Sequence, residues 1–74
     1  MITVNNIIQL FGKNNPDFDS TDLAIYESTD RYYNRYLYSG KCTGINEAIG
    51  KRVVDSIKVE MCNVGYYLYI KVKQ

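Results

Sequence analysis

Near the end of the chain, apolar side chains occupy every second position in two successive runs, and this alternation is the feature that most constrains the fold. The alternating positions are Ile57, Val59, Met61, Leu68, Ile70 and Val72. A period of two residues is typical of β-strands that pack one face on a core. Asn63-Val64-Gly65 lies between the runs and suits a hairpin loop whose last residue has positive φ. We therefore expect a β-hairpin of two half-buried strands.

An earlier hairpin is expected in the tyrosine-rich part of the chain. Apolar residues alternate with others over 22–27, residues 28–30 suit a turn, and a second strand follows over 31–38. In this second strand the even-numbered residues share one face, and the odd-numbered residues, Arg35 among them, share the other. Ser39-Gly40 is expected to end it. Because a tyrosine ring packs against apolar groups while its hydroxyl stays in water, the period leaves open which face is buried.

One short helix is expected before each hairpin. The apolar face of the first consists of Val4, Ile7, Ile8 and Phe11. That spacing places the four side chains on one side of a helix, for which Thr3 suits the N-cap and Gly12 lies just past the end. The second helix is expected between Gly44 and Gly50, with Thr43 or Gly44 as its cap.

These elements, in the order α-β-β-α-β-β, predict a two-layer α+β fold. Residues 13–22, which contain Asn15-Pro16 and several aspartates, are expected to be a loop. The simplest packing is a four-stranded, mainly antiparallel sheet with the N-terminal helix and the short central helix on one face. With 74 residues the chain suits a single small domain over 1–74, whose thin core would gain from burial against a partner or a second copy.

The residue inventory argues against an enzyme. The chain has no histidine, the commonest general base near neutral pH, and its five glycines are isolated rather than arranged in a phosphate-binding loop. Cys42 and Cys62 are too few for a zinc site and are expected to be reduced thiols. We therefore expect no catalytic residue, no metal and no cofactor. Apolar runs are too short for a membrane span and no signal-peptide pattern is present, so we expect a cytoplasmic protein without a membrane partner.

One face of the sheet is a candidate binding surface. If Leu68 and the alternating residues after it point to the core, Tyr67 and Tyr69 point the other way, beside lysines of their own and the neighbouring strand. The candidate partner-binding residues are Tyr67, Tyr69, Lys71, Lys73, Lys58, Tyr36 and Arg35.

Three interpretations of this face stay open. It is an ordinary exposed β-face, whose aromatic and lysine side chains pack across strands. Alternatively, it binds a protein or forms a homodimer, because tyrosine and arginine are enriched where interface energy concentrates. As a third interpretation, its tyrosines stack on the bases of single-stranded nucleic acid while its lysines contact phosphates, although a net charge of +1 is low for that function.

The pattern V-x-x-I-I-x-L-F over 4–11, followed by Asn15-Pro16-Asp17 and Leu23-Ala24-Ile25-Tyr26, resembles a group of small uncharacterised α+β proteins of phages and mobile elements of Gram-positive bacteria. The valine-rich segment 52–59 and the last strand are similar in kind to theirs. The resemblance implies a small non-enzymatic protein that binds or inhibits a host protein, such as a defence effector of the CRISPR type. It transfers no functional residue, because the group has no catalytic or binding motif that can be placed on this chain.

Overall fold

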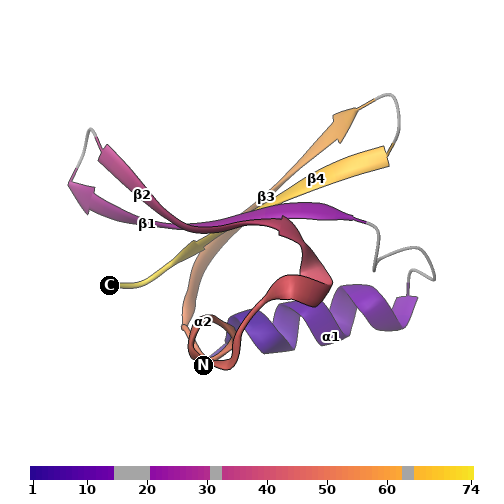
Figure 1. Ribbon diagram of the computed structural model, residues 1–74, viewed down its shortest axis with the longest axis horizontal. Helices are drawn as coiled ribbons and strands as arrows, with labels where there is room; N and C mark the ends of the chain where they lie inside the picture. Colours follow the sequence, from indigo (N-terminus) through magenta and orange to yellow (C-terminus); the bar gives the residue numbers. More distant parts are fainter. Residues whose placement is uncertain (15–20, 31–32, 63–64) are drawn as a thin grey trace.

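The computed structural model describes residues 1–14, 21–30, 33–62 and 65–74 (Figure 1). A short 3-10 helix, Cys42–Gly44, follows the second strand. The remaining elements, in chain order, are helix α1 (Val4–Asn14), strands β1 (Asp22–Asp30) and β2 (Tyr33–Lys41), helix α2 (Glu47–Gly50), and strands β3 (Val54–Cys62) and β4 (Gly65–Val72).

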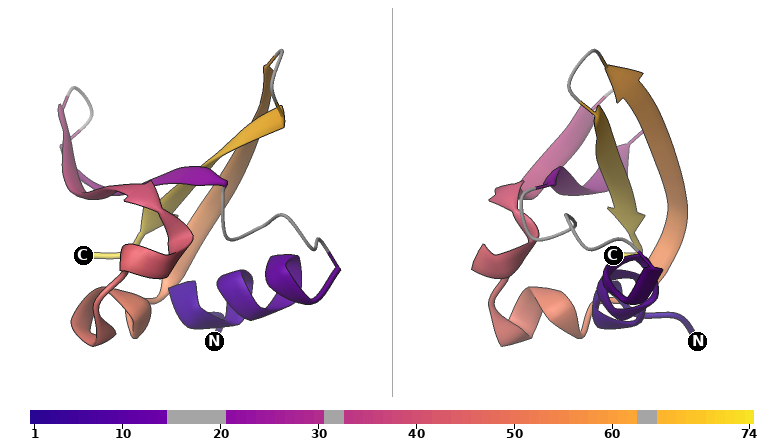
Figure 2. Two further views of the ribbon diagram at one scale, coloured as in Figure 1. Left: turned by 45° about the vertical axis from the view of Figure 1, so that its right-hand side comes forward. Right: turned by 90° about the vertical axis from the view of Figure 1, so that its right-hand side faces the viewer.

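The strands form one four-stranded sheet in the order β2-β1-β4-β3. Each hairpin is antiparallel, and the two hairpins meet at the centre through a parallel pairing of β1 with β4, in which Leu23 lies beside Leu68 and Ile25 beside Ile70. Both helices lie on the same side of the sheet (Figures 1 and 2). The predicted α+β fold with a mainly antiparallel sheet and helices on one face is therefore confirmed.

The core lies between α1 and the two central strands. It consists of Val4, Ile7, Leu23, Ile25, Cys42, Leu68, Ile70 and Val72. The alternation that predicted an inward-facing row on the last strand is confirmed, because Leu68, Ile70 and Val72 are at most 2% exposed. Burying each such side chain stabilises the fold by about 1.5–3 kcal/mol relative to leaving it in water.

Helix α1 begins as predicted and ends later than predicted. The Thr3 hydroxyl accepts from the Asn6 amide at 3.3 Å, and the Asn6 side chain accepts from the Thr3 amide at 2.9 Å, a reciprocal cap. The helix continues through Asn14, so the expectation that Gly12 lies past its end is wrong. A glycine at an exposed helical position costs only about 1 kcal/mol, which flanking residues can offset.

Helix α2 is shorter than predicted and has a different cap. It is capped by Asn46, whose side-chain oxygen accepts from the Ile49 amide at 2.9 Å. The expected caps, Thr43 and Gly44, instead form the 3-10 helix that leads the chain away from β2. An asparagine satisfies the first amides of a helix better than either of them, which explains the later start.

The first hairpin is longer than predicted at both ends. Strand β1 includes residues 28–30, which were expected to form the turn, and β2 continues through Ser39 and Gly40 to Lys41. Gly40 adopts a φ of 148°, which an L-residue rarely adopts, and still pairs with Leu23. An ion pair of 2.9 Å between Lys41 and Asp22 closes this end of the hairpin. Residues 15–20 of the predicted first loop, 31–32 of the predicted second strand and 63–64 of the predicted hairpin loop lie outside the described residues. Gly65, expected as the last residue of that hairpin loop, instead begins β4 opposite Cys62.

A β-bulge decides which tyrosines of β2 face the core. Ile25 pairs with Tyr38, but the next residue, Tyr26, pairs with Tyr36, so Leu37 is the extra residue of the bulge. Tyr38 and Leu37 pack against the core, whereas Tyr36 contacts the ring of Tyr26 on the other face. The prediction that the even-numbered residues of this strand share one face is therefore wrong for Tyr38, because the bulge separates it from Tyr36.

Strand β3 is less buried than predicted. Its alternating side chains Ile57, Val59 and Met61 are 39%, 46% and 79% exposed. Ile57 and Val59 lie opposite Ile70 and Leu68 and thus point to the side of the sheet on which the helices lie. Because β3 is an edge strand, the short helical layer leaves this row uncovered, and the prediction of a half-buried strand is wrong for these three residues.

Candidate functional site

Four tyrosines gather on the face of the sheet opposite the helices. Strand β1 contributes Tyr26, β2 contributes Tyr36, and β4 contributes Tyr67 and Tyr69. The rings of Tyr26 and Tyr36 have centroids 5.6 Å apart, and those of Tyr67 and Tyr69 are 4.9 Å apart. We call this surface the tyrosine face. Its rings lie in two tilted pairs, a geometry that aromatic side chains prefer over flat stacking.

A shallow hollow of about 280 Å³ lies in the tyrosine face. It is lined by Tyr26, Asn34, Tyr36, Lys58, Glu60 and Tyr69. All four strands contribute to this lining, which places the hollow across the sheet rather than along one hairpin. The two hairpins diverge from the centre of the sheet in Figures 1 and 2. The twist of the sheet thus opens a concave surface between them.

A small residue at the centre of the sheet lies beneath the tyrosines. Ala24 pairs with Ser39 on one side and Tyr69 on the other, and it is only 2% exposed. Its neighbours Leu23 and Ile25 point to the core, so its methyl group points to the tyrosine face. The Ser39 hydroxyl and the Tyr67 hydroxyl lie 3.3 Å apart. Larger side chains on both flanking strands therefore cover Ala24.

The charges of the tyrosine face are paired within the chain. The Lys58 ammonium lies 2.9 Å from the Glu60 carboxylate, and this hydrogen bond and charge raise the pKa of Lys58. Partial loss of hydration raises the pKa of the Tyr69 phenol, and the negative charge of Glu60 raises it further. Lys71 lies 3.7 Å from Asp55. The charged groups described on this face thus form two ion pairs whose charges cancel.

The structure brings most of the predicted binding residues together. Tyr67, Tyr69, Lys71, Lys58 and Tyr36 lie on the tyrosine face, and Tyr36, Lys58 and Tyr69 line the same hollow.

Arg35 and Lys73 lie elsewhere. Arg35 pairs with Glu27 on the helix side of the sheet, because the odd-numbered residues of this part of β2 face that way. Lys73 follows the end of β4, where its amide donates to the Val53 carbonyl at 2.9 Å.

Tyr26 and Asn34 were not among the predicted binding residues. Tyr26 follows the buried Ile25, so the alternation of β1 was a sufficient signal for its direction. Asn34 shares the even-numbered face of β2 with Tyr36, and the Ser28 hydroxyl donates to its side-chain oxygen at 3.0 Å. Its place beside the hollow depends on the pairing of β2 with β1, which the sequence does not specify.

The helix side of the sheet carries a charge cluster of a different kind. Glu27 is 7% exposed, and its two carboxylate oxygens lie 2.9 Å from Arg35 and 2.5 Å from Arg52. The same Arg52 guanidinium donates to the Lys73 carbonyl at 2.8 Å. The cluster therefore joins β1, β2, the segment before β3 and the end of β4, and we interpret it as structural.

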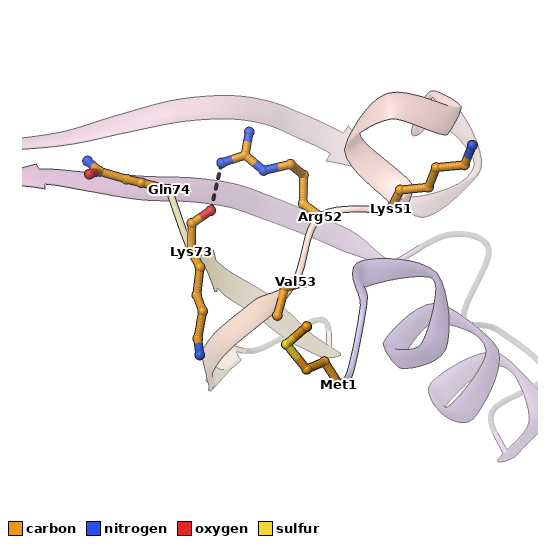
Figure 3. A pocket seen from close by; sticks show the side chains of 6 residues that line it. All are labelled: Met1, Lys51, Arg52, Val53, Lys73 and Gln74. Atoms are coloured by element: carbon orange, nitrogen blue, oxygen red, sulfur yellow. Dashed lines mark hydrogen bonds between the residues drawn. The ribbon is translucent and has the colours of Figure 1, made fainter.

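A second hollow, of about 390 Å³, lies near the two ends of the described chain (Figure 3). It is lined by Met1, Lys51, Arg52, Val53, Lys73 and Gln74. Although it contains three basic residues, Arg52 is bound to Glu27 and to the Lys73 carbonyl, and Lys51 pairs with Glu47 at 3.0 Å. These contacts make the hollow a poor site for an anion.

Within the described residues, no helix has the length and apolar character to cross a membrane. Comparison of the chain with protein-family models, with curated proteins and with solved structures found no match.

Proposed function

We propose that the chain is a small non-enzymatic protein-interaction module that binds a partner through the tyrosine face. The observation that carries the proposal is the convergence of Tyr26, Tyr36 and Tyr69, from three strands, around one hollow. Tyrosine and tryptophan offer large, rigid contact area at a low entropic cost, and binding energy at interfaces concentrates on such residues. The hollow gives a partner side chain a place to insert among them.

The paired charges favour a protein partner over single-stranded nucleic acid. Stacked tyrosines next to lysines are also what a nucleic-acid site requires, and Tyr67, Tyr69, Lys58 and Lys71 would be its components. However, Lys58 and Lys71 both lie within 4 Å of carboxylates, which compete with phosphates for them. Retention on heparin or single-stranded DNA at about 50 mM salt, where phosphate contacts are strong, would overturn this preference.

We further propose that the partner is a host protein in the cytoplasm of a Gram-positive bacterium. The resemblance to phage and mobile-element proteins supports this choice, since a protein that blocks a host defence effector needs a binding surface and no chemistry of its own. A tyrosine face with little net charge fits a partner surface with mixed polar and apolar character.

Capture experiments with matched variants test the proposal. Tyr36 and Tyr33 lie on the same strand and are 58% and 60% exposed, but only Tyr36 lines the hollow. We expect the wild type and Tyr33→Ala to enrich the same protein from a Gram-positive lysate, identified by mass spectrometry. We expect the double variant Tyr36→Ala, Tyr69→Ala to lose it while keeping its circular dichroism spectrum. If the folded double variant still enriches that protein, the tyrosine face is not the binding surface.

A further inference from the structure

The outer edge of β3 is regular and, among the described residues, is unpaired along most of its length. Residues 2–3 pair with the segment that begins β3, through the bridge between Thr3 and Val53 and the Val54 amide, which donates to the Ile2 carbonyl at 2.8 Å. Beyond this point, β3 is the outermost strand of the sheet (Figure 2). Its pairing with β4 continues without a register shift over 56–62. Such an edge presents backbone amides and carbonyls to another strand.

The other edge strand is less suited to pairing. The ladder between β1 and β2 shifts register twice, once between Ile25 and Tyr26 and once between Ser28 and Asp30. Bulges of this kind twist an edge and hinder the addition of a further strand. We therefore expect strand addition, where it occurs, at β3.

The side chains of β3 make it complementary to a second copy of itself. If two β3 strands run antiparallel with Val59 opposite Val59, then Lys58 of one copy lies opposite Glu60 of the other, and the reverse pair forms by symmetry. The same register places the exposed Ile57 opposite Met61 of the second copy. Both charge and apolar character therefore match in this one register.

Neighbouring symmetric registers lack this match. A twofold axis at Lys58 would place Lys58 opposite its own copy, and an axis at Glu60 would oppose two carboxylates in the same way. An axis at Ile57 would place Val59 opposite Asp55. Like charges directly opposite each other are destabilising, which disfavours the first two registers, and the third places a carboxylate against an apolar side chain.

We propose that two copies of the chain associate through β3, antiparallel about a twofold axis at Val59, so that their four-stranded sheets form one continuous sheet. The exposed row of Ile57, Val59 and Met61 becomes part of the dimer contact, which adds apolar burial to a thin core. Side chains that lie opposite each other in this register point to the same side of the sheet, so both tyrosine faces point the same way.

Charge exchange tests the proposed register. In Glu60→Lys and in Lys58→Glu, both interstrand pairs become repulsive, and we expect each variant to dimerise roughly tenfold or more weakly than the wild type in sedimentation velocity. An equimolar mixture of the two variants restores opposite charges at every pair, so we expect it to form a heterodimer. The control Glu47→Lys makes the same change of charge as Glu60→Lys, but at an exposed ion pair of helix α2. We expect it to dimerise like the wild type.

Three results would overturn the proposal. The first is a wild type that stays monomeric into the high micromolar range. The second is a single variant that dimerises as tightly as the wild type, and the third is a mixture that stays monomeric although both variants are folded by circular dichroism. The variant Tyr36→Ala, Tyr69→Ala is expected to dimerise normally, which separates this surface from the proposed binding face. Loss of the dimer in that variant would place the interface on the tyrosine face and contradict the inference.

Discussion

Replacing the buried Glu27 by glutamine tests most directly how much the charge cluster on the helix side of the sheet stabilises the fold. The substitution keeps the size of the side chain and one acceptor oxygen, but it removes the negative charge that lies between Arg35 and Arg52. It also replaces one of the two acceptor oxygens with an amide group, which donates hydrogen bonds and so cannot accept one from the facing arginine. The helix side of the sheet would then hold two guanidinium groups without the carboxylate that joins them.

The expected cost follows from the exposure of the three groups. A hydrogen bond to a charged partner contributes about 1.5–3 kcal/mol when the pair is shielded from water. The Glu27 side chain is only 9% exposed, but the Arg35 and Arg52 side chains are 59% and 31% exposed, so water replaces part of what they lose. We therefore expect a loss of about 2 kcal/mol in the free energy of unfolding, most of it from the contact with Arg52.

Chemical and thermal unfolding followed by circular dichroism measure this loss. For a domain of this size, about 2 kcal/mol lowers Tm by roughly 8–16 °C. The matched control is Glu47→Gln, which breaks an exposed ion pair with Lys51 and is expected to cost less than about 0.5 kcal/mol. If Glu27→Gln is as stable as this control, the charge cluster does not hold the strands together.

Three further predictions concern the core, a close contact and the tyrosine face. Ile70→Ala removes a fully buried side chain and is expected to cost about 2–5 kcal/mol in urea unfolding, enough to unfold much of so small a domain. Gly44→Ala brings a methyl group against the Tyr38 hydroxyl and is expected to cost about 1–3 kcal/mol. In a double-mutant cycle with Tyr38→Phe, which removes that hydroxyl, the cost should fall, and additive effects would contradict the contact. The pKa of Tyr69 is expected above its ordinary value of 10.0, so the folded state keeps this proton longer than the unfolded state and loses stability as pH rises from about 10 through the folded pKa. The ultraviolet absorbance of phenolate, compared between the wild type and Tyr69→Phe, measures that pKa, and Glu60→Gln should lower it; no change would refute the assigned influence of Glu60.

The spacing of apolar residues predicted β4 and α1 correctly, because each of these elements has one face buried in the core. The inward row of β4 follows from alternation alone, because β4 lies at the centre of the sheet and one of its faces is covered by α1. The spacing of Val4 and Ile7 likewise predicted α1, because both side chains lie in the core on one side of the helix. The exposure of Val59 could not be predicted, since the period of β3 shows only that its two faces differ. How far the helices extend across the sheet depends on tertiary packing.

The candidate site was predictable in part. Tyr67 and Tyr69 were placed on the outer face because Leu68 between them points to the core, and successive side chains of a β-strand point to opposite faces. The opposite directions of Arg35 and Tyr36 follow from the alternation of β2, whereas the separation of Tyr38 from Tyr36 depends on a bulge in the ladder with β1 that no residue pattern within β2 predicts. Pairing between strands far apart in sequence brought Tyr26, Lys58 and Tyr69 to one hollow.

The parallel contact between β1 and β4 has a consequence for the order of folding. Each hairpin joins residues that are close in sequence and can form early, whereas the pairing of Leu23 with Leu68 closes a loop of most of the chain. During synthesis the first hairpin precedes the strand with which it pairs, so α1 alone is available to cover its apolar row until residues 68–72 follow. We therefore expect Leu23 and Ile25 to be less buried in this interval than in the complete fold, and a partly folded chain of this kind to be prone to aggregation until β4 pairs.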